Sequence, residues 1–360
     1  MGGAEPRRIL QLVSRDEAGG VQILTRMIEA GFTARGAEVE TLALIRPGST
    51  RERLAHLARV ARRIAGGRYD AIFSYHAAAG LVMATVGRLA GVRKRLSHLT
   101  AMPEAIRPRW RAMDKLAGVS GGYTEVIANS AVTAAAFADF PAAFTRRIRT
   151  IPHGVVPVPA ALHEVDWRAR LAIPAAAGVL VAAGRLTPQK NYETAVKALA
   201  RLPEVHLAIA GDGPLRESLQ ALAAELGVER RLHLIGTLDR AALGDLFAIG
   251  TVYLSPSNWE TFGLAAVEAQ MAGLPVVASD LPVLREVLGA AGRPATLAFH
   301  PVEDDGALAA AAGRLLADPP DAATRAAVAG AARQRYGLDT MVQLYVDLLE
   351  SRSGAAGRPT

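Results

Sequence analysis

Residues 255–280 read Ser-Pro-Ser-Asn-Trp-Glu-Thr-Phe-Gly-Leu-Ala-Ala-Val-Glu-Ala-Gln-Met-Ala-Gly-Leu-Pro-Val-Val-Ala-Ser-Asp, and this stretch decides the fold. The short apolar run before it, residues 251–254, is typical of a buried parallel strand. Residues 264–272 are good helix formers without proline, and Gly273 followed by Pro275 ends that helix. Residues 275–278 are a second apolar run. The pattern therefore predicts a strand, a loop, a helix and a strand, which is one βαβ unit.

The loop of this unit carries residues suited to a nucleotide sugar. Gly263 stands at the predicted helix N-terminus, where free N–H groups and the positive end of the helix dipole favour an anion such as a diphosphate. Glu260 precedes that N-terminus, and Glu268 lies about one turn inside the helix. Ionised carboxylates accept hydrogen bonds from hydroxyls, so the arrangement fits a diphosphate between two polyols. Taken singly, each glutamate would be read as a solvated surface acid.

A second motif follows the apolar run 178–183. Residues 184–191 read Gly-Arg-Leu-Thr-Pro-Gln-Lys-Asn, and a helix is predicted from Tyr192. Arg185 and Lys190 thus leave the end of a strand, where a guanidinium and an ammonium can clamp a diphosphate and stabilise the charge that grows as it leaves. The alternative is a pair of solvated cations.

Both motifs resemble those of the retaining GT-B glycosyltransferases of family 4, or glycosyltransferase group 1. That family has two glutamates separated by seven residues, Phe-Gly shortly after the first glutamate and a Gly-x-Pro ending. The matching residues are Glu260, Phe262-Gly263, Glu268 and Gly273-Leu274-Pro275, preceded by Gly184-Arg185 and Lys190.

The resemblance implies a role for each matching residue. Glu260 would contact hydroxyls of the donor sugar, and Glu268 would hold the ribose. Backbone N–H groups at the helix start would bind the diphosphate, and Arg185 and Lys190 would take part in catalysis together with Glu260. The donor-binding segment implied by the resemblance comprises Glu260, Thr261, Phe262, Gly263, Leu264 and Glu268.

Three glycines are further donor-binding candidates. Gly19 and Gly20 lie between a first strand at residues 7–13 and a helix at residues 21–35, where backbone can approach a phosphate or sugar closely. A tight turn is the plainer explanation, but in the family this loop closes over donor and acceptor. Gly236 follows the strand at residues 231–235, and in the family the loop near this point meets the nucleobase through backbone groups.

His98 is the catalytic candidate of the first half. It ends the strand predicted at residues 93–98, and the carboxyl ends of parallel strands are where open α/β sheets place ligands. In many family members a histidine of the corresponding segment lies near the reacting centre of the sugar. His76 and His153 compete for this role, and a hydrogen-bonded histidine at a strand end is the plain alternative.

Strands and helices alternate through both halves of the chain, which predicts an α/β protein with parallel sheets covered by helices. The resemblance implies a GT-B fold, with two Rossmann-like domains facing a central cleft. We expect an acceptor-binding domain at residues 1–157 and a nucleotide-sugar-binding domain at residues 158–337, joined by the proline-rich residues 157–159. The helix at about residues 338–350 should pack back on the first domain, and residues 351–360 form a flexible tail.

Composition narrows the function classes. The chain has 360 residues, 51% of them hydrophobic, and no cysteine, which excludes disulfides, a thiol nucleophile and cysteine metal sites. No apolar run reaches the length of a signal peptide or membrane span, so we expect a cytoplasmic protein. No pattern of acidic residues predicts a metal site, and no cofactor is expected beyond the donor substrate.

Charge is distributed unevenly along the chain. Residues 1–160 carry 23 basic and 12 acidic residues, whereas residues 161–360 carry 18 and 22. The basic half suggests an acidic partner, and residues 107–115, with four basic residues, Trp110 and Met113, would suit an anionic membrane surface. A solvated basic face is the alternative. Few aromatic residues and no zinc-finger spacing argue against nucleic acid.

The sequence therefore predicts a metal-independent retaining glycosyltransferase. It would move a sugar from a nucleotide-diphosphate sugar to a glycan or lipid-linked acceptor, in cell-envelope polysaccharide or glycolipid synthesis, with peripheral contact at the inner face of the plasma membrane. The rivals are a non-catalytic nucleotide-sugar-binding or scaffold protein and a nucleotide-sugar epimerase of similar shape.

Overall fold

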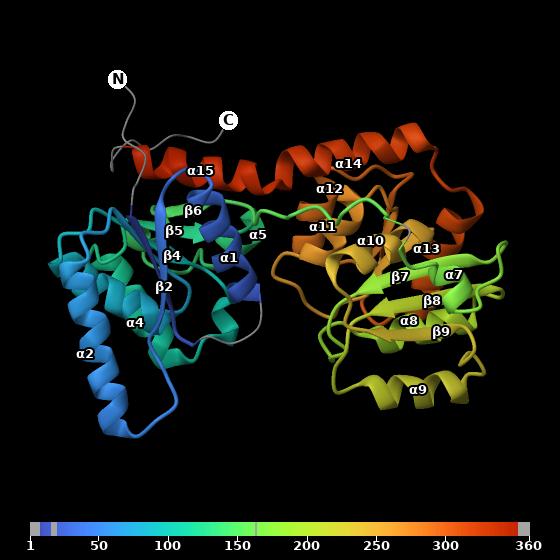
Figure 1. The fold of residues 1–360 in the computed structure, drawn as a ribbon, viewed down its shortest axis with the longest axis horizontal. Helices are drawn as coiled ribbons and strands as arrows, with labels where there is room; N and C mark the ends of the chain where they lie inside the picture. The colour runs from blue at the N-terminus through green and yellow to red at the C-terminus, as the bar shows by residue number, and fades with distance from the viewer. Residues whose placement is uncertain (1–7, 16–19, 163, 352–360) are drawn as a thin grey trace. The chain divides into compact units, whose positions relative to one another are not determined.

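The structure is a computed structural model, and it describes residues 8–15, 20–162 and 164–351. The chain forms two compact units (Figure 1). Unit 1 comprises Met1–Gly154 and Leu338–Thr360, and unit 2 comprises Val155–Gly337. The chain passes between the units just before the proline-rich segment, three residues ahead of the boundary expected from the sequence. Gly19 lies outside the described residues.

Unit 1 is built on a parallel sheet of six strands in the order β2-β1-β3-β4-β5-β6. β3 and β5 are buried over their whole length, as expected for a sheet covered on both faces. β2, at the sheet edge, is half-exposed. The strands are β1 (Arg8–Val13), β2 (Glu38–Ala43), β3 (Ala71–Ser74), β4 (Lys94–His98), β5 (Glu125–Ala128) and β6 (Ile148–Thr150).

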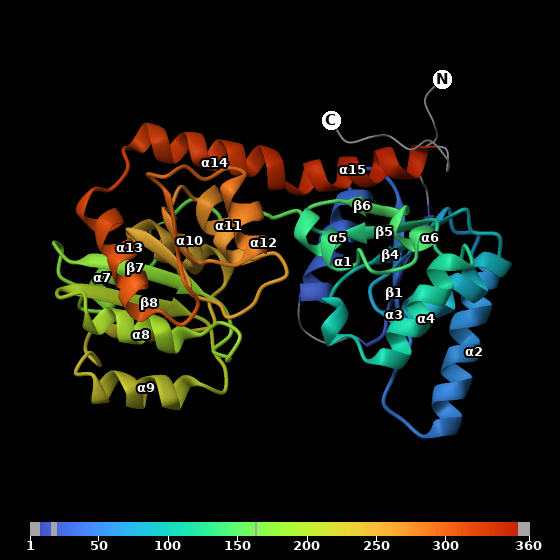
Figure 2. The same ribbon diagram turned by 180° about the vertical axis from the view of Figure 1, so that it is seen from behind.

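Helices cover both faces of this sheet (Figures 1 and 2). One face packs against α1 (Gly20–Thr33) and the C-terminal helix α15 (Leu338–Glu350). The other face packs against α2, α3 and α4. The remaining elements of unit 1 are α2 (Thr50–Gly66), α3 (Ala77–Val82) with its π-helical extension η1 (Met83–Gly87), the 3-10 turn η2 (Pro103–Ala105), α4 (Pro108–Val119), α5 (Ala131–Ala136) and α6 (Ala142–Thr145).

Unit 2 repeats the design with a second parallel sheet of six strands, in the order β12-β11-β10-β7-β8-β9. β8 and β10 are buried throughout. The strands are β7 (Gly178–Ala183), β8 (Val205–Ala210), β9 (Leu232–Gly236), β10 (Val252–Ser255), β11 (Val276–Ser279) and β12 (Leu297–His300).

One face of the second sheet forms a continuous core with α8, α9 and α13 (Figure 2). This core is rich in Leu, Val and Ala, which pack in preferred rotamers between helix and sheet. The helices of unit 2 are α7 (Trp167–Arg170), α8 (Tyr192–Ala200), α9 (Arg216–Glu225), α10 (Arg240–Ile249), α11 (Leu264–Met271), α12 (Pro282–Gly289), α13 (Asp305–Ala317) and α14 (Ala322–Tyr336).

The α/β prediction is confirmed: the chain contains two parallel Rossmann-like sheets, each covered by helices. The βαβ unit predicted from residues 251–278 is β10-α11-β11, with each strand one residue later than expected. Of the helices in the described part of the chain, none has the length and apolarity needed to cross a membrane.

Candidate functional site

The loops that follow β7 and β10 meet at the point where the strand order of the second sheet reverses. From β7 the chain adds β8 and then β9 on one side, and it returns to place β10 on the other side. β7 and β10 are direct neighbours, with Leu180 opposite Val252. At such a point, the loops after two neighbouring strands run in opposite directions and leave a crevice at the carboxyl ends of the strands. Open α/β sheets bind ligands in this crevice.

Hydrogen bonds tie these two loops together. The N–H of Asn258 donates to Gln189 O at 2.8 Å, and the Asn258 side-chain amide donates to Pro188 O at 3.0 Å. The Gln189 amide in turn donates to Trp259 O at 3.1 Å. Each loop therefore holds the other in place, and their side chains are positioned before a ligand arrives.

Lys190 and Glu260 form an ion pair across the two loops. Lys190 Nζ lies 2.5 Å from Glu260 Oε1, and Ser257 Oγ donates to the same oxygen at 2.9 Å. The lysine side chain is 23% exposed and the glutamate side chain 7%. Desolvation strengthens the pair and makes each charge depend on the other. The sequence predicted both residues as ligand contacts but did not predict this ion pair.

The helix α11 begins beside this pair. Its N-cap is Gly263, in the left-handed region at φ 89°, and no side chain caps the helix. A side chain at this position would also meet Leu284, because an added Cβ would lie 2.6 Å from Leu284 Cδ2. One small pocket is lined by Lys190, Glu260, Gly263 and Ala265. The uncapped N-terminus and the ammonium thus face the same space, which suits an anion.

Arg185 leaves the same loop but extends into solvent. Its guanidinium has no hydrogen-bond or ion-pair partner within residues 8–15, 20–162 and 164–351. The backbone beside it is fixed, because the Leu186 N–H donates to Asp212 O at 3.0 Å. The nearby Gly211 must be glycine: a Cβ there would lie 2.0 Å from Gly184 O. Arg185 is therefore an exposed cation on a rigid loop.

Glu268 forms the second ion pair of the site. Arg240 Nη1 lies 3.0 Å from Glu268 Oε1, and Arg240 Nη2 donates to Val156 O at 2.6 Å. Burial raises the pKa of Glu268, and the Arg240 guanidinium opposes that rise. The glutamate side chain is 18% exposed, so one edge of the carboxylate stays open to solvent. Arg240 was not predicted, since its partner stands 28 residues later in the sequence.

The other residues of the predicted donor segment differ in exposure. Thr261 is exposed, whereas Phe262 is buried and packs edge-on against Tyr336, with ring centroids 5.6 Å apart. Phe262 can therefore meet a ligand only through its backbone. Leu264 is the first residue of α11. Gly236 ends β9 at φ 92°, and its carbonyl accepts from the Gly211 N–H at 2.7 Å, so that carbonyl is already engaged.

In unit 1, Gly20 begins α1 and is exposed, and a Cβ added there would meet no atom within 4 Å. The structure therefore leaves open space at Gly20. Its predicted neighbour in the donor loop, Gly19, is outside the residues described here.

His98 is largely buried, although it also lines a pocket of unit 1, and its proposed role at a ligand stays a prediction. Nδ1 lies 3.1 Å from Ser74 O, and Nε2 lies 2.8 Å from the Tyr345 hydroxyl. A carbonyl only accepts, so Nδ1 carries the hydrogen and Nε2 accepts from Tyr345. The ring also stacks on Tyr75, with centroids 4.5 Å apart. Burial lowers the pKa of His98 to about 3. Both ring nitrogens are engaged within the protein, and the ring is neutral.

The rival histidines are placed differently. His76 precedes α3 and borders a pocket of about 360 Å³ in unit 1, together with Thr100, Arg107 and Trp110. His153 lies 3.2 Å from the Asn129 amide through Nε2. His98 borders the same pocket, so open volume and a tryptophan suited to an acceptor lie beside both His76 and His98.

The basic segment at residues 107–115 begins α4 and is only partly free. Arg107 and Arg109 are exposed, but Lys115 Nζ lies 4.4 Å from the centre of the Phe140 ring. Trp110 is half-buried and lines the unit 1 pocket. The described residues contain no group of three His, Asp or Glu side chains placed to hold a metal ion.

Comparison with known families adds to this geometry. Residues 164–335 match the family described as glycosyl transferases group 1. The matched stretch is just under half of the chain. It covers most of unit 2 and contains both ion pairs, Lys190–Glu260 and Arg240–Glu268.

Several similar proteins are named as glycosyltransferases. A D-inositol 3-phosphate glycosyltransferase from Xylanimonas cellulosilytica is 35% identical over 214 residues, which cover 56% of this chain and 51% of the relative. A protein of the same name from Catenulispora acidiphila is 29% identical over 323 residues, covering 82% and 75%. In the first alignment the chain spans about half the length of the relative (51%).

The solved structure of Anabaena HepE in complex with UDP has a TM-score of 0.79 to this chain, with 21% identity, and covers 95% of this chain and 99% of its own. At that identity the likeness shows the fold. The GT-B prediction is confirmed.

Proposed function

We propose that this protein is a retaining glycosyltransferase of family 4 whose donor is a nucleotide-diphosphate sugar. The observation that carries the proposal is the Lys190–Glu260 pair beside the uncapped N-terminus of α11. An ammonium and a helix N-terminus suit the diphosphate, and a carboxylate suits sugar hydroxyls. Glu268 would accept hydrogen bonds from the ribose. Anabaena HepE was solved with UDP, which supports a nucleotide donor.

The proposed chemistry uses the two cations of the β7 loop. The bond between the anomeric carbon and the diphosphate oxygen breaks, and Arg185, Lys190 and the N-terminus of α11 stabilise the negative charge on the leaving group. The acceptor hydroxyl attacks the oxocarbenium-like carbon from the same face. Its proton passes to the leaving phosphate oxygen, and the configuration is retained. Three positive groups replace the charge that a metal ion would supply, so we propose a metal-independent reaction with no cofactor.

Unit 1 would hold the acceptor, which we propose to be a glycan or a lipid-linked sugar of cell-envelope synthesis. Support comes from the charge of this half of the chain and from the pocket beside His76. The protein would act in the cytoplasm, at the inner face of the plasma membrane. Cosedimentation with anionic vesicles at low and high salt tests this, because attraction is worth about 1 kcal/mol per basic residue near the surface. A protein that stays in the supernatant at low salt contradicts membrane contact.

Turnover of a donor tests the main proposal. The protein is incubated with radiolabelled UDP-, GDP- and ADP-sugars and candidate acceptors, and nucleotide diphosphate and glycosylated product are both measured. Transfer with retained anomeric configuration is the expected result. A non-catalytic binding protein would bind a nucleotide sugar without releasing nucleotide diphosphate, and an epimerase would yield an isomer of the donor sugar.

A further inference from the structure

A large open pocket in unit 1 lies between α1 and the edge strand β2. Its volume is about 830 Å³, within the range of pockets that hold small molecules. Among the described residues, four arginines from four places in the chain line it, together with one acid, Glu29. These arginines are Arg15 after β1, Arg26 on α1, Arg46 after β2, and Arg53 on α2.

The pocket results from the pattern of α1. The residues of α1 that line it, at positions 22, 25, 26 and 29, follow the spacing i, i+3, i+4 and i+7, so they share one face of the helix. The buried residues Leu24 and Ile28 pack on the sheet instead. Opposite this polar face lie Thr41 and Ala43 of β2. They are two residues apart in the strand, so they lie on the same face of the sheet.

The floor of the pocket is fixed by a buried glutamine. Gln11 Nε2 donates to Thr25 O at 2.9 Å and to Thr41 Oγ1 at 3.2 Å. Tyr75 donates its hydroxyl to Gln11 Oε1. Because Thr41 Oγ1 accepts from Gln11, its own hydroxyl hydrogen can donate toward the pocket. α1 and the edge strand are thus held at a fixed separation.

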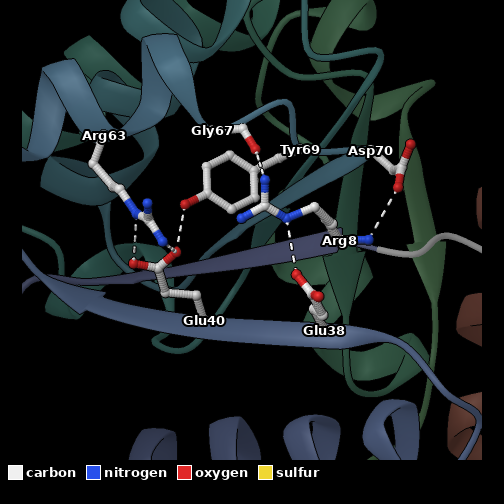
Figure 3. Close-up of polar contacts among 7 residues, drawn as sticks. All are labelled: Arg8, Glu38, Glu40, Arg63, Gly67, Tyr69 and Asp70. Carbon is white, nitrogen blue, oxygen red and sulfur yellow. Dashed lines mark hydrogen bonds and ion pairs between the residues drawn. The ribbon is translucent and has the colours of Figure 1, made fainter.

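The arginines at the two ends of the β1–β2 pair differ in whether they form ion pairs with carboxylates. At the amino end the arginines are neutralised by carboxylates: Arg8 Nε lies 3.1 Å from Glu38 Oε2, and Arg63 Nη2 lies 3.0 Å from Glu40 Oε2 (Figure 3). Tyr69 donates to the same Glu40 oxygen.

At the carboxyl end, Arg26, Arg46 and Arg53 have no carboxylate within ion-pair distance in the described part of unit 1. Three guanidinium groups around one cavity repel one another, which raises the free energy of the empty state. An anion that enters the pocket relieves this repulsion.

We propose that this pocket binds the phosphate group of a phosphorylated acceptor. Phosphate binding is argued from the pocket itself, and the role of the ligand as acceptor rests on the proposed transferase function. Guanidinium groups match phosphate oxygens with paired hydrogen bonds. A phosphate dianion balances the excess of arginines over Glu29 better than a single carboxylate does. None of the described residues that line the pocket is aromatic and able to stack on a base, which disfavours nucleic acid. The remaining volume accommodates the sugar or glycerol that carries the phosphate.

Calorimetry on the full chain with glycerol 3-phosphate tests the site, with excess UDP present to occupy the donor site of unit 2. We expect saturable binding at low salt that weakens about tenfold in Arg26→Gln and again in Arg53→Gln, since a hydrogen bond to a charged group contributes about that factor. Arg59→Gln and Arg62→Gln are the matched controls. Both lie on α2 and remove the same charge outside the pocket, so binding should stay within about twofold of the unchanged protein.

Glu29→Gln should change the affinity for glycerol 3-phosphate in the opposite direction. Removing the acid of the pocket should tighten glycerol 3-phosphate binding severalfold, whereas Glu104→Gln, an exposed acid of unit 1 outside the pocket, should not. A uniform response to all charge changes would show that only net charge acts and would overturn the proposal.

A second arm identifies what carries the phosphate. Vesicles containing phosphatidic acid replace glycerol 3-phosphate in a sedimentation assay with the same variants. Loss of vesicle binding in the Arg26→Gln/Arg53→Gln double variant, with binding kept in the controls, assigns the site to a lipid phosphate. Pocket-dependent binding of glycerol 3-phosphate alone assigns it to a soluble phosphorylated acceptor. If neither probe shows binding that depends on the pocket arginines, the proposal is wrong. Failure of the donor site would instead appear as missing UDP binding in every variant.

Discussion

The Lys190 ammonium and the Glu260 carboxylate, 2.5 Å apart, join the loops that follow two neighbouring strands of the second sheet. Each residue neutralises the other in a largely buried site. A donor must therefore enter a space where positive and negative charge are already balanced. An incoming diphosphate would compete with Glu260 for Lys190, and the carboxylate released in this way can accept hydrogen bonds from sugar hydroxyls. Binding of the proposed donor would thus be coupled to rearrangement of the pair.

Breaking this pair on one side should cost both activity and stability. Lys190→Met should lower turnover by roughly 10²-fold or more, as expected for loss of a charge-stabilising donor. It should also destabilise unit 2, because Glu260 is left buried without its cation. Steady-state kinetics and urea unfolding measure the two effects.

A double-mutant cycle controls for this interpretation. Lys190→Met/Glu260→Gln removes both charges, so it should be more stable than the two single losses added together, with a coupling of roughly 0.5–3 kcal/mol. Stabilities that simply add would show that the two side chains do not interact in solution.

Arg185→Ala should separate activity from stability. The guanidinium is exposed and unpaired among the described side chains, so its loss should leave the free energy of unfolding within about 0.5 kcal/mol. If it clamps the diphosphate, turnover should still fall by roughly 10²-fold. Arg230→Ala, at another exposed arginine of unit 2, is the matched control and should change neither. Unchanged turnover in Arg185→Ala would remove this residue from the mechanism.

Nucleotide binding should weaken in acid through Glu268. Only the ionised carboxylate accepts two hydroxyl hydrogen bonds, and burial raises the pKa of Glu268 above its usual value. Binding should therefore be present above that pKa and lost as the pH falls through it. Arg240 opposes the rise, so Arg240→Met should move the midpoint of this loss to higher pH. UDP titration calorimetry between about pH 4.5 and 8 measures the midpoint.

Glu268→Gln is the control for that pH profile. It keeps the shape of the side chain and removes the titration, so UDP should bind more weakly but without the acidic loss. A midpoint that stays in place in Arg240→Met would show that another group governs the profile.

The fold was predictable because its signals are local. Gly273 and Pro275 follow a run of helix formers and end the helix there. Buried strands of a parallel sheet are recognisable in the sequence as apolar runs. Positions of helix and strand ends differed by a residue or two, since chain ends fray and hydrogen bonding decides the last residue. The parallel order of the strands followed from the alternation of helix and strand.

The site was predictable only in part, because its contacts are long-range. Arg185 and Lys190 were predicted from their place after a strand and Glu260 from its place before a helix, and the structure brings Lys190 and Glu260 together. Nothing local marks Arg240, which reaches Glu268 from another helix. The hydrogen bond of His98 could not be predicted for the same reason: its ring nitrogen meets the hydroxyl of Tyr345, 247 residues later in the chain.

Metal independence remains a prediction for the transfer reaction. The positive groups proposed for the diphosphate are Arg185, Lys190 and the N-terminus of α11, so a divalent ion has no assigned place. Turnover should be unchanged in excess EDTA. A preparation made free of zinc is the control. Loss of turnover in EDTA, followed by recovery when magnesium or manganese is added, would falsify this expectation.

His98 should behave as a structural residue that stays neutral in the folded protein. Its pKa is lowered to about 3 by burial, whereas an unfolded histidine titrates near pH 6.5. Folding therefore becomes less favourable as the pH falls from about 6.5 towards 3, because the unfolded chain takes up a proton that the folded chain refuses. Nitrogen NMR should show the Nδ1–H form of the ring throughout pH 5–8, a range set by the cited pKa values.

Substitution then distinguishes this structural role from catalysis. Tyr345→Phe removes the hydroxyl that donates to His98 Nε2 and leaves a buried acceptor unsatisfied, which should cost about 1–3 kcal/mol of stability. UDP binding, which we assign to unit 2, should not change. His98→Leu should reduce the acid dependence of the unfolding free energy by up to one proton. His76→Ala, at the pocket of unit 1, should instead lower turnover at nearly unchanged stability. A large loss of kcat in a fully stable His98→Leu variant would return His98 to the active site.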